Sequence, residues 1–411
     1  MELCHNAREA ARNIAVASAD VKNKVILKIA DRMHKEREKI KSANDRDLEQ
    51  ARQSGLDRVL VERLRFDDAK IDGRIRSLRT IAGLPDPVGQ YDEFVRRPNG
   101  LRVGRMRVPL GVILMIYEAR PHVTVNAAAF CIKSGNAIIL KGGSEVLETN
   151  KVLGAIITGA LKEFNLPVTT VQVVSTSDRS VVQELLQQDE FIDLVIPRGG
   201  EKLIQYVNDT SRIPVIKHYK GVCHCYVEDS ANLNTALDIV IDSKMLMPEV
   251  CNALETLLVQ RTAAQEFLPL LKKTADEVNL KIRGCGDTRA IIDADEATEE
   301  DWSTEYLDAI LSVKVVENVE DAIHHIETYG SGHTDTIVTE NIQNAERFVN
   351  AIDSSVVLVN ASTMFNDGEE IGLGAEIGIS TEKLHARGPM GLKELTSYKF
   401  VIHGNGHCKK S

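Results

Sequence analysis

Cys251 is the residue of this sequence whose surroundings best suit covalent chemistry. It lies in MPEVCNALETLLV (residues 247–259), between a proline that ends a predicted helix over residues 236–245 and an apolar run that predicts a buried strand. Most free cysteines are small buried hydrophobic residues. A thiol at a junction near a helix terminus can instead be exposed and have its pKa lowered, which makes it a nucleophile. The sequence therefore makes Cys251 a candidate nucleophile.

Two glycine pairs, each preceded by a cation, follow predicted strands. They are Lys141, Gly142 and Gly143 after AIILK, and Arg198, Gly199 and Gly200 after DLVIP. Glycines at a strand-to-helix turn let a phosphate approach the backbone N–H groups at the helix N-terminus. Neither pair belongs to a strict GxGxxG motif, and glycine pairs are also common in ordinary tight turns. We expect these turns to bind a nucleotide, with Lys141 suited to a ribose or a 2′-phosphate.

Other polar stretches carry weaker signals. Cys223, His224 and Cys225 alternate as expected for core or edge residues of a strand, and without a second ligand pair nearby they predict no metal site. The adjacent His324 and His325 fall in a predicted helix and are expected to be half-exposed. GHTDT (332–336) and the long loop that contains EIGLGAEIGIS (370–380) and HARGPMG (385–391) are expected to be functional, because purely connecting loops are shorter.

The elements that must position these residues change along the chain. The first 90 residues or so predict helices over 8–21, 23–41 and 44–54, with a helix start at Asn44 and Asp45. Residues 94–111 then predict a hairpin around an Asn99-Gly100 turn. The arms of this hairpin carry five arginines and few large apolar residues, so we expect it to project from a lobe or to be buried against another subunit.

From residue 108 onward the pattern becomes strand, helix, strand. Short β-branched runs over residues 112–117, 137–141, 171–175 and 193–197 alternate with helical stretches over 148–164 and 180–188. A second series begins at CYVED (225–229) and includes ETLLVQ, VKVVE, TIVTE and SVVLVN. This pattern predicts an α/β protein with doubly wound parallel sheets, whose ligands bind beyond the carboxyl ends of the strands.

Composition excludes several classes of protein. The chain has 411 residues, so two or three lobes are expected, and its net charge of -10 argues against a nucleic-acid or anionic-membrane surface. No apolar run reaches the length of about 18 residues that a membrane span needs. Seven scattered cysteines form no disulfide framework and, with an N-terminus unlike a signal peptide, predict a cytoplasmic protein.

Together these stretches resemble one family, the γ-glutamyl phosphate reductases of the aldehyde dehydrogenase superfamily. The resemblance runs in order from about residue 5 to 406, and the motifs that carry it are VPLGVILMIYEARPHVTVNAAAFCIKSGNAIILKGG, DLVIPRGG, PEVCNALETLLV, YGSGHTDTIVTE, VNAST and FNDGEEIGLGAEIGISTEKLHARGPMGL. It implies an aldehyde dehydrogenase-like fold with two doubly wound parallel-sheet lobes and a β oligomerisation flap. The expected domains are an NADPH-binding domain (1–93 and 109–222), a catalytic domain (223–395) and the flap (94–108 and 396–411).

The family reaction implied by this resemblance reduces L-glutamate 5-phosphate with NADPH to L-glutamate 5-semialdehyde and phosphate, the second step of proline biosynthesis from glutamate. Cys251 would form the thioester, and its backbone N–H would stabilise the oxyanion. The resemblance further implies that Lys141 and Glu305 contact the two riboses of the cofactor. The enzyme is expected to be a homo-oligomer, and a separate glutamate 5-kinase, which must supply the acyl phosphate, is a candidate partner.

Departures from the wider pattern leave some roles open. Hydrolytic relatives place an asparagine two residues before a proline as second oxyanion donor, but this chain has Ala119 there, which leaves Asn126 or Arg120 as candidates. Many members of the narrower family have arginine where this chain has Met247 and Met364. The remaining candidates for binding the substrate's anionic groups are Arg120, Arg198, His333 and Arg387.

Two alternatives follow from these departures. The first is a hydrolytic or other acylating aldehyde dehydrogenase for an acidic semialdehyde, although VIKHYKGVCH (215–224) lacks the glutamate with which hydrolytic enzymes activate water. The second is a catalytically silent binding protein. Dependence of the reverse reaction on inorganic phosphate separates the reductase from the first alternative. A thiol reagent that labels Cys251 no faster than a cysteine of an unfolded chain would favour the second.

Overall fold

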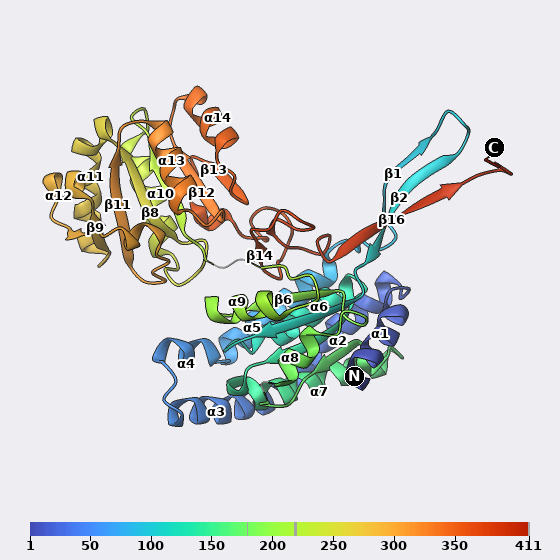
Figure 1. The fold of residues 1–411 in the computed structure, drawn as a ribbon. Helices are drawn as coiled ribbons and strands as arrows, with labels where there is room; N and C mark the ends of the chain where they lie inside the picture. The colour runs from blue at the N-terminus through green and yellow to red at the C-terminus, as the bar shows by residue number, and fades with distance from the viewer. Residues whose placement is uncertain (179, 218–219, 410–411) are drawn as a thin grey trace. The chain divides into compact units, whose positions relative to one another are not determined.

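The computed structural model describes residues 1–178, 180–217 and 220–409 (Figure 1). The chain forms two compact units, the first made of residues 1–217, 373–378 and 390–411, and the second of residues 218–372 and 379–389. Residues 373–378 and 390–395, which the sequence predicts to belong to the catalytic domain, are part of the first unit. In the part of the chain that the structure describes, no helix is long and apolar enough to cross a membrane.

Unit 1 begins with helices, as predicted, but several of the predicted boundaries are wrong, and the helix predicted over residues 23–41 is divided between α2 and α3. The helices are α1 (Glu2–Ile14), α2 (Ala19–Lys35), α3 (Arg37–Gln53), α4 (Arg58–Leu64) and α5 (Asp68–Gly83). The first ends at Ile14 because Ser18 caps α2, its hydroxyl accepting a hydrogen bond from Val21 N. Asn44 starts no helix: it is buried within α3, where its amide donates to Leu64 O and its Oδ1 accepts from Phe66 N.

The central sheet of unit 1 confirms the predicted strand–helix alternation. Four parallel strands run in the order β5-β4-β3-β6. The strands are β3 (Val112–Tyr117), β4 (Ala137–Gly142), β5 (Val171–Val173) and β6 (Leu194–Arg198), and the helices among them are α6 (His122–Lys133), α7 (Leu147–Glu163), α8 (Ser180–Leu186) and α9 (Glu201–Thr210). Every residue of β3 and β4 is buried, as expected for the central strands of a sheet covered by helices on both faces (Figure 1).

Unit 2 contains a larger parallel sheet in the order β10-β9-β11-β8-β7-β12-β13. Its strands are β7 (Cys223–Val227), β8 (Leu254–Gln260), β9 (Lys281–Gly284), β10 (Asp295–Glu296), β11 (Ile310–Val316), β12 (Thr334–Val338) and β13 (Val356–Val359). Of the two positions expected for the CHC stretch, core or edge of a strand, the core is confirmed, because β7 lies between β8 and β12 and is buried throughout. Sequence alternation alone could not show that both neighbours of this strand are present.

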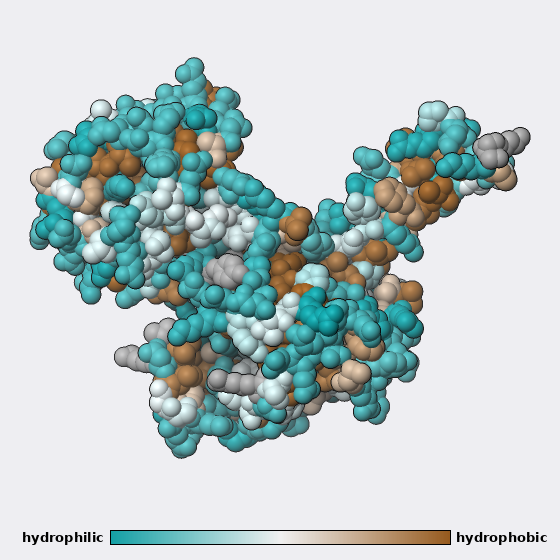
Figure 2. All heavy atoms as spheres, viewed as in Figure 1, coloured by the Kyte–Doolittle hydropathy of each residue, from teal (hydrophilic) through white to brown (hydrophobic). Residues whose placement is uncertain are grey.

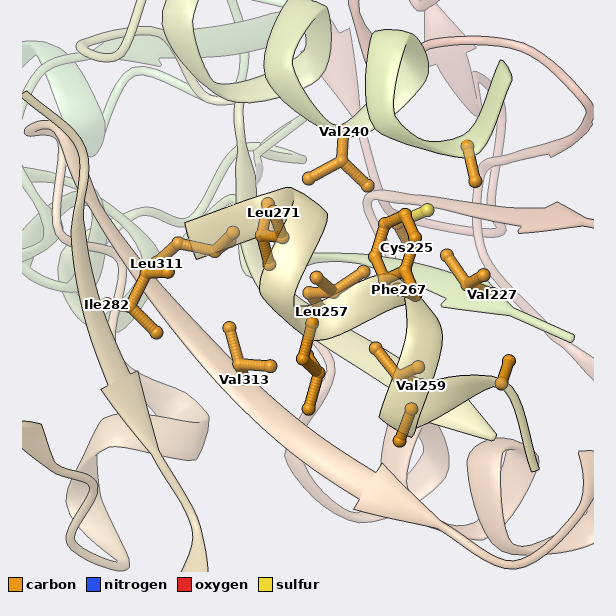
Figure 3. Packing of buried hydrophobic residues seen from close by; sticks show 14 of the residues in the cluster. Cys225, Val227, Val240, Leu257, Val259, Phe267, Leu271, Ile282, Leu311 and Val313 are labelled. Carbon is orange, nitrogen blue, oxygen red and sulfur yellow. The ribbon is translucent and has the colours of Figure 1, made fainter. Parts of the chain in front are cut away.

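Helices cover both faces of this larger sheet. One face packs against α10 (Leu233–Met245), α11 (Arg261–Glu277) and α12 (Gly286–Ile291), in a core that includes Phe267, Leu257 and Val313 (Figure 3). The other face packs against α13 (Val319–Tyr329) and α14 (Ile342–Ala351) around Tyr226 and Phe348. In α13 the two histidines differ, since His324 is exposed and His325 is buried, so the prediction of a half-exposed pair is wrong.

Unit 1 also contains a three-stranded antiparallel sheet, drawn apart from its parallel sheet in Figure 1. It consists of β1 (Tyr91–Arg96), β2 (Arg102–Pro109) and β16 (Thr396–His403). The hairpin is confirmed, but its turn has Pro98 and Asn99 at the centre, because Gly100 N donates to Arg97 O at 2.9 Å. Proline favours this central position, and Gly100 takes the following left-handed conformation with φ 87°.

Short elements complete the chain. The two-stranded antiparallel sheet of β14 (Ile379–Ser380) and β15 (Gly388–Pro389) closes the long loop after residue 366. Single 3₁₀ turns occupy Ser144–Val146, Val168–Thr170, Glu300–Ser303 and Thr363–Phe365.

Candidate active site

Cys251 lies in a turn between α10 and β8, as its sequence context predicts. Val250 N donates to Met247 O at 3.4 Å and Ala253 N donates to Val250 O at 3.1 Å, which folds the chain tightly around the cysteine. Cys251 itself is half-buried, whereas the cysteines of β7 are fully buried. The turn therefore makes the Cys251 side chain partly accessible, as a nucleophile requires.

The turn is tied to the rest of unit 2 through the residue after the cysteine. Asn252 is buried, and its Nδ2 donates to Met364 O at 3.3 Å and to Asn366 O at 3.2 Å. Because an amide that loses buried partners costs stability, Asn252 fixes one end of the turn. Met364, which replaces a frequent arginine of the family, thus contributes its backbone carbonyl to this support.

A second set of contacts fixes the backbone carbonyl of Cys251. Cys223 Sγ donates to Cys251 O at 3.3 Å. A Cβ built on Gly221 would lie 1.8 Å from the same oxygen, so only glycine fits there. Gly221 N in turn donates to Glu305 Oε1 at 3.0 Å. Glu305, a predicted cofactor residue, and Cys251 are therefore linked through one backbone segment.

The GHTDT stretch lies beside this segment. His333 is buried, with its Nδ1 2.7 Å from Thr334 Oγ1 and 3.7 Å from Cys223 Sγ. Asp335 accepts hydrogen bonds from the backbone N–H of His224 and lies 2.9 Å from its Nδ1. Most of this stretch therefore belongs to the start of β12 rather than to a loop. It brings His333 close to Cys223, which contacts the carbonyl of the candidate nucleophile Cys251.

A buried ion pair lies close to the same residues. Lys244 Nζ and Glu255 Oε2 are 2.6 Å apart, and both side chains are fully buried. Burial raises the pKa of Glu255 to about 7, while Lys244 opposes this rise and Glu305 adds to it. Glu255 Oε1 also accepts from Leu307 N at 3.4 Å, so the pair holds the loop that carries Glu305.

The predicted cofactor residues of unit 1 lie at the carboxyl ends of β4 and β6 and in the turns that follow them. The strand order reverses between β3 and β6, and such a switch point is where open α/β sheets bind ligands. Arg120 follows β3 and Arg198 ends β6, so these two cations flank the switch point. Lys141 ends the neighbouring strand and is buried.

The glycine turns leave little room for side chains. A Cβ on Gly142 would lie 2.4 Å from Asn150 Nδ2, and one on Gly199 would lie 2.7 Å from Leu203 Cδ2. At the second turn, however, Gly200 N donates to Glu118 Oε2 at 2.9 Å, which puts a carboxylate at the N-terminus of α9. Phosphate binding by Gly199 and Gly200 remains a prediction.

A group of cations gathers around His122 in unit 1. Burial, together with the smaller effects of the charges of Arg74, Arg120, Arg198 and Lys70, lowers the pKa of His122 to about 3. Of these residues, Arg120 and Arg198 are predicted site residues. The sequence gives no signal for His122, Arg74 and Lys70, since residues of separate helices meet here only in the folded chain. This positive region suits an anionic ligand.

The two positions considered for the oxyanion donor have unusual environments. Asn126 lies on α6, and its buried Oδ1 has no hydrogen-bond partner in the described part of the chain. Ala119 has φ 43°, a left-handed conformation that strains residues with a Cβ, and its N–H donates to Glu145 Oε1 at 2.7 Å. Neither observation assigns the second donor.

Arg387, a predicted substrate residue, is exposed and held by an acidic residue. Its guanidinium forms an ion pair with Asp353 at 2.9 Å and also donates to Asp353 O at 2.7 Å. It therefore stands apart from the support of Cys251, and its role in substrate binding remains a prediction.

The structure thus gathers the predicted residues into two groups, one in each unit. Cys251, Glu305 and His333 share the neighbourhood of β7 in unit 2. Unit 1 contains Asn126, on α6, and the residues at or just after the ends of its strands: Arg120, Lys141, Arg198 and the glycines. Gly221 and Cys223, which contact Cys251, were not predicted as site residues, and their only signal was the closeness of GVCHC to a strand start. Over the described ranges no cluster of His, Cys, Asp or Glu suits a metal ion.

Comparison with known proteins places the chain in a family. Residues 1–288 match the aldehyde dehydrogenase family. A γ-glutamyl phosphate reductase from Desulfatibacillum aliphaticivorans is 50% identical over 410 residues, which cover 100% of this chain and 98% of that protein.

Solved structures agree with this assignment. The crystal structure of a γ-glutamyl phosphate reductase from Thermotoga maritima superposes with a TM-score of 0.97 at 46% identity, covering 100% of this chain and 99% of that one. An acetylating aldehyde dehydrogenase from Geobacillus thermoglucosidasius, at 16% identity and a TM-score of 0.71, covering 100% of this chain and 97% of that one, shares the fold alone. The expected aldehyde dehydrogenase-like α/β fold is confirmed.

Proposed function

Because the chain belongs to the γ-glutamyl phosphate reductases of the aldehyde dehydrogenase family, we propose that it reduces L-glutamate 5-phosphate through a thioester on Cys251. The products are L-glutamate 5-semialdehyde and phosphate, and the reaction is the second step of proline synthesis from glutamate. The single observation that carries the assignment of the nucleophile is the partly accessible Cys251 in a rigid turn.

The chemistry of Cys251 follows from its place in the turn. Its thiolate attacks the acyl carbon, the bond from carbon to the phosphate oxygen breaks, and phosphate leaves with the electron pair, so that no strong acid is needed. The backbone N–H of Cys251 donates to the oxygen on which negative charge develops. The absence of a water-activating glutamate in residues 215–224, of which 218 and 219 lie outside the described residues, protects the thioester from hydrolysis.

NADP(H) fits the carboxyl edge of the sheet in unit 1. The cations Lys141 and Arg198 at the ends of β4 and β6 support binding of its phosphates there, with Gly142, Gly143, Gly199 and Gly200 as further candidate contacts, and Glu305 is our candidate for the nicotinamide ribose. When bound, NADPH supplies the hydride that converts the thioester to the aldehyde level. Arg120, His333 and Arg387 are the residues that we propose for the anionic groups of the substrate, and Asn126 is our candidate for the second oxyanion donor.

The experiment is NADPH formation from glutamate 5-semialdehyde and NADP, with and without inorganic phosphate. We expect phosphate-dependent activity in the wild type that is lost in Cys251→Ala and kept in Cys285→Ala, a half-buried cysteine elsewhere in unit 2. Activity without phosphate would favour the hydrolytic alternative. A folded, NADP-binding wild type with no activity would favour the silent binding protein.

The three-stranded sheet is our candidate for the oligomerisation flap. Its last strand exposes Tyr398, Phe400 and Ile402 by 47%, 63% and 57%, and Figure 2 shows hydrophobic surface over this sheet. Such an apolar patch suits burial against a second copy of the chain. Phe400→Asp should lower the molar mass measured by light scattering, and an unchanged mass would exclude this surface.

Two further assignments belong to the proposal. The scattered free cysteines suit a reducing cytoplasm.

The acyl phosphate hydrolyses easily in water, so direct transfer from a glutamate 5-kinase would protect it. A pull-down with that kinase tests this partner.

A further inference from the structure

Cys223 lies under the turn that carries the nucleophile. Its side chain is fully buried, and its Sγ donates to Cys251 O at 3.3 Å. Cys223 is the first residue of β7, where it pairs with Leu254 of β8, and the register between the two strands shifts immediately after it. Such irregularities re-aim a side chain and are frequent next to active sites. Here the re-aimed side chain is a thiol that contacts the nucleophile's own carbonyl.

The Cys223 thiol is a hydrogen-bond donor rather than a second nucleophile. Burial raises its pKa well above the ordinary value, and the negative charges of Asp335, Cys251 and Glu255 raise it further. The thiol therefore keeps its proton at neutral pH, and more firmly when Cys251 is a thiolate. A protonated thiol has one S–H group to donate, and the carbonyl oxygen of Cys251 can accept this hydrogen bond.

Other side chains also lie near this thiol: that of Thr334 hydrogen-bonds to it, and His333 is a more distant acceptor than Cys251 O. His333 Nδ1 lies 3.7 Å from Cys223 Sγ, which is 0.4 Å farther than Cys251 O. The same nitrogen lies 2.7 Å from Thr334 Oγ1, a distance that marks a normal hydrogen bond. The thiol proton is therefore directed to the carbonyl of the nucleophile.

Two side chains, those of Glu305 and Ser331, hold the backbone just before Cys223 in place. Gly221 N donates to Glu305 Oε1 at 3.0 Å, and Val222 N donates to Ser331 Oγ at 2.9 Å. Gly221 also packs so closely on Cys251 O that a Cβ would not fit. Segment 221–223 is thus a fixed surface on which the carbonyl of Cys251 rests.

We propose that Cys223 is a positioning residue for the reaction, whose S–H group holds the backbone carbonyl of Cys251 and so fixes the turn that presents the nucleophile. The inference rests on the proposed function, since it concerns the presentation of the same thiol. Attack on the acyl carbon depends on placing the sulfur within a few tenths of an ångström, so a looser turn lowers the rate of the chemical step. Binding of NADP and phosphate does not use this contact and is unaffected.

The chain offers a matched control two residues along the same strand. Cys225 is equally buried, but it packs among the apolar side chains of the core that α10 and α11 form with the sheet (Figure 3). Cys225→Ala removes the same atoms as Cys223→Ala and leaves a similar cavity. A difference between the two variants in catalysis therefore reports the carbonyl contact rather than lost packing.

The test measures kcat and KM for the phosphate-dependent reaction, together with the rate at which iodoacetamide alkylates Cys251, followed by mass spectrometry. We expect Cys223→Ala to lower kcat about three- to tenfold with KM for NADP and phosphate unchanged, as loss of one hydrogen bond at the transition state predicts. Cys223→Ser, which keeps a donor, should recover most of this loss. Cys225→Ala should keep the wild-type kcat even where it lowers the melting temperature.

Two results would overturn the inference: a Cys223→Ala variant with the kcat of Cys225→Ala, or a serine variant no faster than the alanine variant. If Cys223→Ala does not fold, Cys223→Val fills the space without a donor and carries the same expectation, with Cys225→Val as control. The proposed function fails differently, through a Cys251→Ala variant that stays active or a wild type that needs no phosphate.

Discussion

Gly221→Ala is the sharpest test of how the structure holds its nucleophile. The added Cβ would lie 1.8 Å from Cys251 O and 2.6 Å from Cys251 C, whereas real Cβ atoms essentially never come within 3.0 Å of another heavy atom. One of the two backbones must therefore move by at least about 1.2 Å. Both contacts are to backbone atoms, so no side chain can rotate away to relieve the clash.

The expected result is a loss of catalysis. Misplacing a reacting group by about 1 Å costs roughly 10²-fold in rate, so we expect kcat of the phosphate-dependent reaction to fall by about that factor. Gly221 N also donates to Glu305, the candidate ribose ligand, so KM for NADP should rise as well. The assay is NADPH formation at saturating glutamate 5-semialdehyde and phosphate, with the melting temperature measured in parallel.

Gly286→Ala is the matched control for this variant. A Cβ on Gly286 meets nothing within 4 Å, and the residue begins α12, where alanine is favoured over glycine. This variant should keep wild-type activity and stability. A folded Gly221→Ala enzyme with kcat within threefold of wild type would refute the argument that this glycine fixes the position of Cys251.

Three further predictions concern stability. Lys244→Met should destabilise the fold by about 3–5 kcal/mol because it leaves Glu255 buried without its partner. In urea unfolding, the double variant Lys244→Met with Glu255→Leu should recover most of this loss. Equal urea midpoints for the single and the double variant would contradict the cost assigned to the unpaired Glu255. Because the pKa of Glu255 is raised from 4.5 to about 7, the folded protein binds a proton more tightly than the unfolded chain, so this group's stabilisation is complete below about pH 4.5 and is lost as pH rises through 7. Glu255→Gln should flatten that part of the curve of stability against pH, and a curve that keeps its slope would contradict the assignment. Ala119→Gly should stabilise the protein by about 1 kcal/mol because glycine accepts a φ of 43° without strain, and a lower urea midpoint would argue against strain at this position.

Local patterns in the sequence predicted most of the strands correctly. Residues 112–117 and 137–141 are mostly apolar and rich in isoleucine and valine, since a central parallel strand buries both faces, and they form β3 and most of β4. The helix limits were less accurate, because Asn44 has the residue type of a helix cap but satisfies its amide inside the fold, against Leu64 and Phe66. A pattern of neighbouring residues carries no information about such distant partners.

For the candidate site, the sequence by itself singled out Cys251 as the candidate nucleophile and located the glycine turns, because proline and glycine constrain the local backbone through their own covalent structure. Only the tertiary structure decided what surrounds them. The contacts of Cys223 and Gly221 with the carbonyl of Cys251 join residues about 30 positions apart, and the cations around His122 come from separate elements. Such contacts depend on strand order and on the register between β7 and β8, which arise from packing of the whole sheet rather than from any short stretch of the chain.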